Sequence, residues 1–132
     1  MFQAARFTWR PFQRSLADAA DPGAATEIED VAVIFCHAEV QDEAKRSKIV
    51  TKATKNIKWL AGKRGLKRVV LHSFTHLGGD TAEAALAQAL LAEIGARLKR
   101  AGYEVAYTPF GWVCEWELSV HGESLAKVYK AI

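Results

Sequence analysis

Blocks of hydrophobic and polar residues along the chain predict an α/β fold. The run Val31–Val40 is almost continuously apolar, which is typical of a strand buried on both faces of a sheet. Lys67–Phe74 contains a second run of this kind. Trp112–Val120 alternates instead, with tryptophan, cysteine and leucine on one side and glutamates on the other. We therefore expect a strand there with one buried and one wetter face.

Two longer segments have the 3.6-residue spacing of amphipathic helices. In Asp42–Ala61 the apolar residues fall on one side and most lysines on the other. The second helix is expected to run to Ala101, with Asp80 or Thr81 as its N-cap and Gly102 as its C-terminal stop.

The remaining segments complete a single domain over residues 1–132. We expect an opening strand pair at Phe2–Leu16, a surface loop at Asp18–Glu29, a strand at Tyr103–Tyr107 and a terminal helix at Glu123–Ala131. The predicted architecture is an α/β mixed sheet with two long helices and a short C-terminal helix.

Charge is distributed unevenly along the chain. Lys and Arg number 18 against 15 Asp and Glu, yet no acidic residue occurs between Ala44 and Gly79, where ten basic residues fall. A surface that is merely solvated usually mixes both signs, so this stretch favours contact with a phosphate backbone over plain solvation. The expected nucleic-acid contacts are Lys45, Lys48, Lys52, Lys55, Lys63 and Arg64.

The cysteines and the hydropathy indicate a cytoplasmic protein. Cys36 and Cys114 both lie in apolar runs, so no disulfide framework is needed and a reducing compartment fits. No run of about 18 apolar residues occurs, so we expect no membrane span. The first 17 residues have arginines and no acids, as a transit peptide would, but they fit better as opening strands.

Two short segments about thirty residues apart predict a binding pocket. Ser73–Gly79 and Thr108–Trp112 each look like a strand that runs into a tight turn with glycine. We expect the two strands to be neighbours, so that the turns form one pocket with His76 at its rim. The alternative is a histidine that only satisfies a turn carbonyl. The two glycines of the first turn do not make a nucleotide triphosphate loop.

Other chemistry at these positions is less well supported. The residues Cys36, His37, His76 and Cys114 could converge, but their spacing does not match a zinc site, and we predict neither metal nor cofactor. A small-molecule hydrolase that uses Cys114 as nucleophile and His76 as base stays open as an alternative, although a buried, inert cysteine is the commoner case.

Taken together, Phe74–Leu77, the long helix that ends at Arg100–Tyr103, and Pro109–Gly111 resemble a known family. The chain is similar over nearly its whole length to the N-terminal editing domain of archaeal threonyl-tRNA synthetase, which is related in fold to D-aminoacyl-tRNA deacylase. This resemblance implies a dimeric α/β domain that hydrolyses serine wrongly attached to threonine tRNA.

The resemblance also implies roles for individual residues. The family's pocket histidine corresponds to His76, which would be catalytic. Two positions depart from the family, because its pocket lysine corresponds to Cys114 and its nearby acidic residue to Lys127. The substrate-binding positions that follow from the resemblance are Ala38, Thr75, Phe110, Gly111, Val113, Cys114 and Lys127.

We therefore expect a freestanding deacylase that edits misacylated tRNA in trans, most readily Ser on threonine tRNA. Its expected partners are the aminoacylated 3′ end of tRNA, a second copy of the chain and a threonyl-tRNA synthetase. Two alternatives remain: a non-catalytic module of the same fold that binds tRNA or a synthetase, and a deacylase with altered amino-acid specificity.

Overall fold

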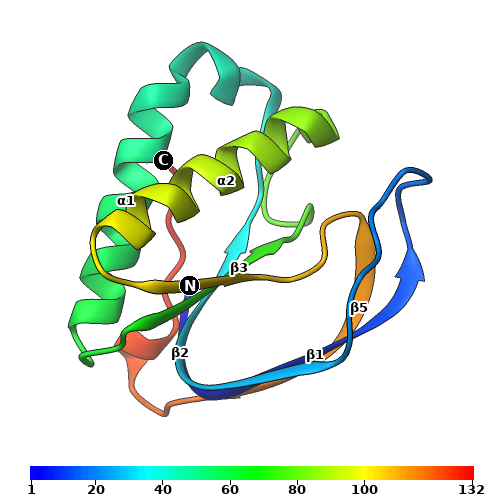
Figure 1. The fold of residues 1–132 in the computed structure, drawn as a ribbon. Coiled ribbons are helices and arrows are strands. Elements are labelled where there is room, and N and C mark those ends of the chain that lie inside the picture. The colour runs from blue at the N-terminus through cyan, green and yellow to red at the C-terminus, as the bar shows by residue number, and fades with distance from the viewer.

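The computed structural model describes residues 1–132 and contains a five-stranded mixed sheet with two long helices on one face (Figure 1). This confirms the predicted α/β class. The strands are β1 (Phe2–Arg14), β2 (Thr26–Cys36), β3 (Arg68–Ser73), β4 (Glu104–Tyr107) and β5 (Trp112–Val120). The helices are α1 (Arg46–Gly62) and α2 (Ala84–Arg100), with 3₁₀ turns at Val40–Lys45 and Ser124–Ala126. The strand order is β4-β3-β2-β1-β5, with β2, β3 and β4 parallel and β1 antiparallel to both of its neighbours.

The sheet is strongly curled. Its two edge strands, β4 and β5, are joined only by residues 108–111. A flat sheet of this order would separate its edges by about 19 Å, since neighbouring strands lie about 4.8 Å apart. The five Cα–Cα steps from Tyr107 to Trp112 span at most about 18 Å when the chain is fully extended. The sheet must therefore curve so that β4 and β5 approach each other at this end, as Figure 1 shows.

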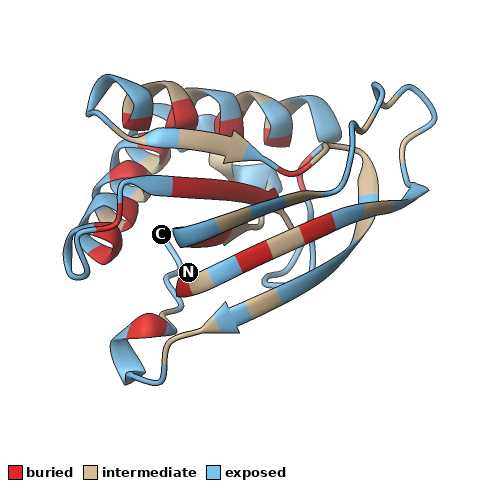
Figure 2. Cartoon of the chain, turned by 60° about the horizontal axis from the view of Figure 1, so that its bottom comes forward, coloured by how far each residue is buried: buried red, intermediate tan, exposed pale blue.

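The curl gives the sheet two different cores, because successive side chains of a strand point to opposite faces. In β2, Ala32 and Ile34 pack against α1 and α2, whereas Val31 and Val33 pack inside the curl. The buried stripes of both helices face the sheet (Figure 2). We call the two sides the helix-side core and the inner core. The inner core is completed by Ala4, Phe7, Trp9 and Val70.

The strands at the start of the chain differ from the prediction. Phe2–Leu16 is not a strand pair but contributes one long strand, β1, which pairs with β2 and β5. β2 begins at Thr26, inside the predicted loop, and ends at Cys36 rather than at residue 40. The apolar run did not predict this early start, because the first part of β2 contains the exposed residues Glu27 and Glu29, which nevertheless pair with β1.

Both long helices begin later than expected. Residues 42–45 belong to a 3₁₀ turn whose N-cap is Glu39, with the Asp42 carboxylate accepting the backbone N–H of Glu39 at 2.9 Å. The N-cap of α2 is Glu83, so the predicted caps Asp80 and Thr81 are wrong. Thr81 instead forms a β-bridge with Glu39, which keeps this segment extended. The predicted end of α2 is confirmed, since the helix ends at Arg100 and is followed by Ala101 and Gly102.

The predicted C-terminal helix is wrong. Only Ser124–Ala126 is helical, as a single 3₁₀ turn, and the chain then continues in extended form. The reason lies at the other end of the chain, where the backbone groups of Val128 exchange two hydrogen bonds with Met1, at 2.8 and 2.9 Å. Lys127 bridges Phe2 in the same way. Tertiary pairing with the start of β1 thus replaces the helical bonds that the residue pattern favours.

Candidate functional site

The candidate site lies at one edge of the sheet, where β2, β3 and β4 all end. These strands are parallel and adjacent, so their carboxyl ends meet there. The prediction that the two candidate turns end neighbouring strands is therefore confirmed. A hydrogen bond of 2.7 Å between the Nδ1 atom of His72, in β3, and the hydroxyl of Thr108, directly after β4, joins the bases of the two turns. Burial lowers the pKa of His72 to about 4, so this ring is neutral.

The loop between β3 and α2 presents His76 to solvent. The ring of His76 packs edge-on against Phe74, with centroids 5.1 Å apart, and its side chain makes no hydrogen bond within the chain. Behind it, the backbone N–H groups of Leu77 and Gly78 donate to Nδ1 of His37, at 3.1 and 3.0 Å. The Glu39 carboxylate accepts the N–H of Gly79 at 3.1 Å. A solvent-accessible imidazole is thus placed on a well-anchored loop.

The turn between β4 and β5 is built around Gly111. Its φ of +80° is a conformation that L-residues rarely adopt, and an added Cβ would lie only 2.8 Å from the Cβ of Ala19. The Gly111 carbonyl accepts the backbone N–H groups of Ser15 and Leu16, at 2.8 and 3.1 Å. The indole N–H of Trp112 donates to Ala20 at 2.9 Å. The β1–β2 loop therefore packs directly against this turn.

Both turns contain backbone donors without a partner. The N–H groups of Thr75, His76, Phe110 and Gly111 have no hydrogen-bond partner within the chain. Such groups need an acceptor, whether water or a ligand. These four N–H groups are therefore available as donors to oxygen atoms outside the chain.

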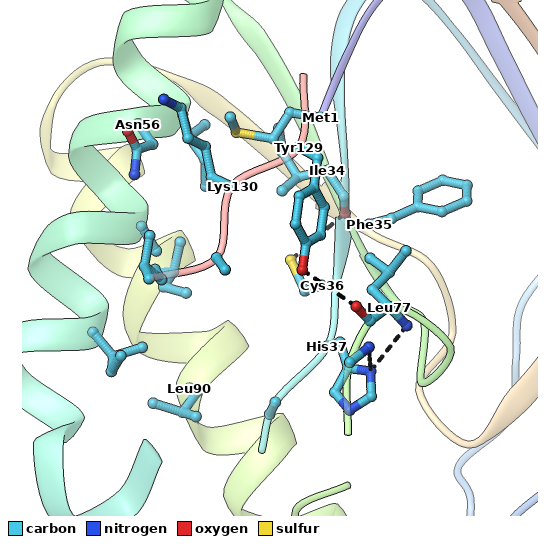
Figure 3. Close-up of a pocket in the computed structure, with 18 of the residues that line it drawn as sticks. Met1, Ile34, Phe35, Cys36, His37, Asn56, Leu77, Leu90, Tyr129 and Lys130 are labelled. Atoms are coloured by element: carbon cyan, nitrogen blue, oxygen red, sulfur yellow. Dashed lines mark hydrogen bonds between the residues drawn. The ribbon is translucent and has the colours of Figure 1, made fainter. Parts of the chain in front are cut away.

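The two turns do not form the single pocket that the sequence predicted, because each borders a different cavity. The first, of about 470 Å³, lies between α1, α2 and the C-terminal residues, and Leu77 and Gly78 form part of its wall (Figure 3). Most of its lining is apolar. Tyr129 also lines this cavity, and its hydroxyl donates to the Leu77 carbonyl at 3.3 Å (Figure 3). The second cavity, of about 520 Å³, lies between α2, the β1–β2 loop and the turn at Thr108–Phe110.

The predicted substrate residues divide between these places. Ala38 and Lys127 line the first cavity, and Phe110 lines the second. Ser73, at the end of β3, contributes to both. The remaining predicted positions line neither cavity; these are Thr75, His76, Gly111, Val113 and Cys114.

Comparison with known proteins assigns a family to this arrangement. The model of the archaea-specific editing domain of threonyl-tRNA synthetase matches residues 1–132. The chain belongs to this editing-domain family. Membership supports a role in tRNA editing, which is a proofreading step of translation, and a hydrolase activity at the level of the family.

Individual relatives agree with this assignment. The chain is 31% identical over 117 residues to a threonine-tRNA ligase of Methanopyrus kandleri, which covers 89% of the chain and 19% of the ligase. It is 29% identical to the ligase of Hyperthermus butylicus, over 97% of the chain and 21% of the ligase. The ligase of Thermococcus gammatolerans is 32% identical over 80% of the chain and 17% of the ligase. The chain spans about a fifth of the length of the relatives it matches.

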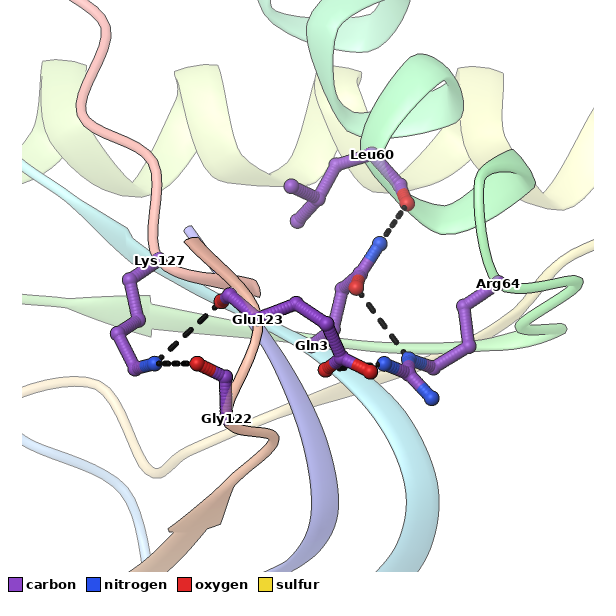
Figure 4. Close-up of polar contacts among 6 residues, drawn as sticks. All are labelled: Gln3, Leu60, Arg64, Gly122, Glu123 and Lys127. Atoms are coloured by element: carbon purple, nitrogen blue, oxygen red, sulfur yellow. Dashed lines mark hydrogen bonds and ion pairs between the residues drawn. The ribbon is translucent and has the colours of Figure 1, made fainter. Parts of the chain in front are cut away.

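Cys114 and Lys127, the two positions expected to depart from the family, make no hydrogen bond to His76. Cys114 packs against the inner core, and burial raises the pKa of its thiol, which disfavours the thiolate that a nucleophile needs. Cys36 packs on the helix side, where burial raises the pKa of its thiol to about 12. Lys127 donates to the carbonyls of Gly122 and Glu123, at 3.1 and 3.4 Å (Figure 4). Val113 is exposed on the opposite face of β5 from Cys114.

The basic stretch is partly neutralised by acids from elsewhere in the sequence. Arg46, Arg64 and Arg68 form ion pairs with glutamates of α2, of the turn at residue 123 and of β4. Arg64, a predicted tRNA contact, lies 2.6 Å from Glu123 and also donates to Gln3 (Figure 4). The predicted lysines are exposed and form no ion pair. They are Lys45, Lys48, Lys52, Lys55 and Lys63, along about 25 Å of helix.

Four residues of the site were not among the predicted functional positions. His37 appeared only as a potential metal ligand, and Glu39, His72 and Tyr129 were not singled out. His72 left a signal, because it is a polar residue within an apolar strand that precedes the candidate turn. The roles of the others depend on contacts across about 40 to 50 residues of sequence. Neither α1 nor α2 has the length and apolar character of a membrane-spanning helix.

Proposed function

We propose that this chain is an aminoacyl-tRNA deacylase that hydrolyses serine from threonine tRNA. The observation that supports this most strongly is the match of all 132 residues to the editing-domain family. Further support comes from the two turns, which contain backbone N–H groups without a partner, and from the exposure of His76.

The reaction is needed because a synthetase distinguishes serine from threonine only weakly. A synthetase pocket that fits threonine cannot strongly reject serine, since a missing methyl group changes the binding free energy by only about 1–3 kcal/mol. A separate hydrolytic site can then remove the error. Such a site must admit the smaller residue and exclude the larger correct one.

In the proposed mechanism, the free N–H groups of Thr75, Phe110 and Gly111 bind the carbonyl and ribose oxygens of the acyl-adenosine end. His76 positions the substrate or the attacking water. Water adds to the ester carbonyl carbon, the bond to the ribose oxygen breaks, and the ribose oxygen takes up a proton. The serine leaves as the free acid. Ala38 would contact the adenosine from the wall of the first cavity.

The proposal extends to the partners. The exposed lysines of α1 would contact phosphates of the tRNA, with a strong dependence on salt. A second copy of the chain would complete a homodimer, and a threonyl-tRNA synthetase would supply the mischarged tRNA. Action in trans is part of the proposal.

The test is a deacylation assay with Ser-tRNA and Thr-tRNA, both on threonine tRNA, and the 132-residue chain as the only protein. We expect release of serine well above the rate in buffer, with Thr-tRNA spared. His76→Ala should lower kcat at least tenfold. The proposal would be overturned if no amino acid were released from any member of a panel of aminoacyl-tRNAs that includes D-amino acids.

A second candidate is a tRNA- or synthetase-binding module without activity. It is favoured by the environment of Lys127, whose amine donates to two carbonyls, and of Cys114, whose partly buried thiol has a raised pKa. The thiol carries no charge, and the Lys127 amine already donates to two backbone carbonyls. In this case tRNA binding should persist, weaken steeply with salt and be unaffected by His76→Ala. A deacylase with altered specificity would instead release another amino acid from the panel.

A further inference from the structure

The geometry points to His37 as the positioning residue of this site: its Nδ1 atom holds the backbone directly after His76 and thereby fixes where the catalytic imidazole lies. The role in catalysis rests on the proposed function. The role in fixing the loop does not, and each can be tested separately.

His37 comes directly after the last residue of β2, and its ring reaches the loop that follows the neighbouring strand β3 (Figure 3). Its Nδ1 atom accepts two successive backbone N–H groups, from Leu77 at 3.1 Å and Gly78 at 3.0 Å. Its Nε2 atom lies 3.5 Å from the Thr81 hydroxyl. One ring therefore contacts both ends of the segment 77–81.

These contacts determine the protonation state of the ring. An imidazole nitrogen accepts hydrogen bonds only when it carries no proton. Nδ1 must therefore be unprotonated, and the neutral ring carries its proton on Nε2, on the side of Thr81. Because two donors occupy Nδ1, His37 cannot serve as the general base. Its contribution is to hold the loop.

The neighbouring groups complete a frame around the loop. Glu39 accepts the N–H of Gly79 at 3.1 Å, so three successive N–H groups are held by side chains of the segment after β2. Gly78 has no side chain to obstruct this, since an added Cβ would lie 2.5 Å from Oε1 of Glu39. On the other side, the N–H of Phe74 donates to the Cys36 carbonyl at 2.8 Å.

His76 lies between these two fixed points. Its own side chain has no hydrogen bond to hold it, so its position depends on the backbone before and after it. Residues before it are fixed by the sheet, and residues after it by His37 and Glu39. Loss of the Nδ1 acceptor would leave two N–H groups unpaired and allow the loop to shift. A displacement of about 1 Å at a reacting group is enough to reduce the rate strongly.

Matched substitutions separate the acceptor from the bulk of the ring. In His37→Asn the amide oxygen lies the same number of bonds from the backbone as Nδ1, so the acceptor is retained. His37→Ala removes it, and His37→Gln moves it one bond farther out while keeping a polar side chain of similar size. The free energy of unfolding of each variant is measured first. If His37→Ala does not fold, His37→Gln takes its place.

The kinetic test uses Ser-tRNA on threonine tRNA. We expect His37→Ala to lower kcat tenfold or more with KM changed less than about threefold, since two hydrogen bonds are lost at the loop rather than at the tRNA surface. His37→Asn should restore most of kcat. Wild-type kcat in His37→Ala, or no rescue by His37→Asn in a folded protein, would overturn the catalytic role.

The loop is tested by NMR on the free protein, without substrate. We expect the ¹⁵N shift of an unprotonated Nδ1 on His37, and amide exchange at Leu77 and Gly78 that is tenfold or more faster in His37→Ala and restored in His37→Asn. A proton on Nδ1, or unchanged exchange, would overturn the positioning role. If the wild-type chain releases no amino acid, the proposed function fails, while these measurements still decide the role of His37 in the loop.

Discussion

The two turns at the site are held in different ways. The β3–α2 loop, which contains His76, is held by side chains that reach it from other segments, namely His37, Glu39 and Tyr129. The β4–β5 turn is held by backbone bonds to the Gly111 carbonyl and by the lack of space for any side chain there. One turn is fixed by hydrogen bonds to side chains that can be substituted, and the other by backbone hydrogen bonds and steric fit.

This difference should appear in how each turn responds to change. A hydrogen bond from a surface side chain contributes about 1 kcal/mol, so substitutions at the first loop should alter its position more than the stability of the protein. A glycine with a positive φ and no free space contributes to folding itself. We therefore expect function to be sensitive at the first turn and stability at the second.

The largest effect is expected at the bond that joins the two turns, between His72 and Thr108. The pKa of His72 is about 4 in the folded protein and about 6.5 when unfolded, so the unfolded chain binds a proton first. The contribution of the neutral His72 ring to the free energy of unfolding is fully present well above pH 6.5. It falls by about 1.4 kcal/mol per pH unit between pH 6.5 and 4, to a total loss of roughly 3 kcal/mol.

Urea unfolding at several pH values measures this loss. His72→Asn keeps a polar group near Thr108 but does not titrate. The free energy of unfolding of the wild type, relative to that of His72→Asn, should therefore decrease by roughly 3 kcal/mol as the pH falls from 7 to 4. A constant difference from pH 7 to pH 4 would contradict the prediction.

The next largest effect is expected at Gly111. Gly111→Ala combines an unfavourable φ with a contact of 2.8 Å to Ala19, and should reduce the free energy of unfolding by about 2–3 kcal/mol. Gly65→Ala is the matched control, because Gly65 also has a positive φ, +67°, but open space around it. It should cost about 1 kcal/mol. Equal losses in the two variants would show that packing at the second turn is unimportant.

A smaller effect on stability is expected at Gly78, in the first turn. The added Cβ would meet the end of the flexible Glu39 side chain, which can move away, so Gly78→Ala should cost less than about 1 kcal/mol. Deacylation should nevertheless fall severalfold, because Glu39 is displaced from Gly79. Gly79→Ala, whose nearest neighbour would be 3.9 Å away, is the control. A larger loss of stability than in Gly111→Ala would invert the comparison.

The smallest effect is expected at Tyr129. Its hydrogen bond to Leu77 is long, at 3.3 Å, and the side chain is 66% exposed, so Tyr129→Phe should change the free energy of unfolding by less than about 0.5 kcal/mol. Faster amide exchange confined to residues 76–79 would place Tyr129 in the frame of the loop. Unchanged exchange would leave that frame to His37 and Glu39 alone.

The sequence was sufficient for features that depend on local pattern. The bounds of β5 agree with the predicted Trp112–Val120, because each face of that strand has its own residue types. The end of α2 followed from Gly102, and the adjacency of the two candidate turns followed from their similar strand-turn form.

Features that depend on distant contacts were missed. The C-terminal helix failed because residues 127 and 128 pair with residues 1 and 2. The cap of α2 moved because residue 81 bridges residue 39. The basic stretch contains no acidic residue, yet three of its arginines form ion pairs with glutamates of α2, β4 and the C-terminal turn. These glutamates are distant in sequence, so the local pattern could not predict the ion pairs.

The pairing of Met1 with Val128 has a topological consequence. Both end segments line the first cavity, so the chain is already nearly a closed ring. A short linker from residue 132 to residue 1 would add little loop entropy, and the ring could then be opened at the exposed turn around Gly23. Such a circular permutant of residues 1–132 would have its new ends beside the second cavity, which Gly23 lines.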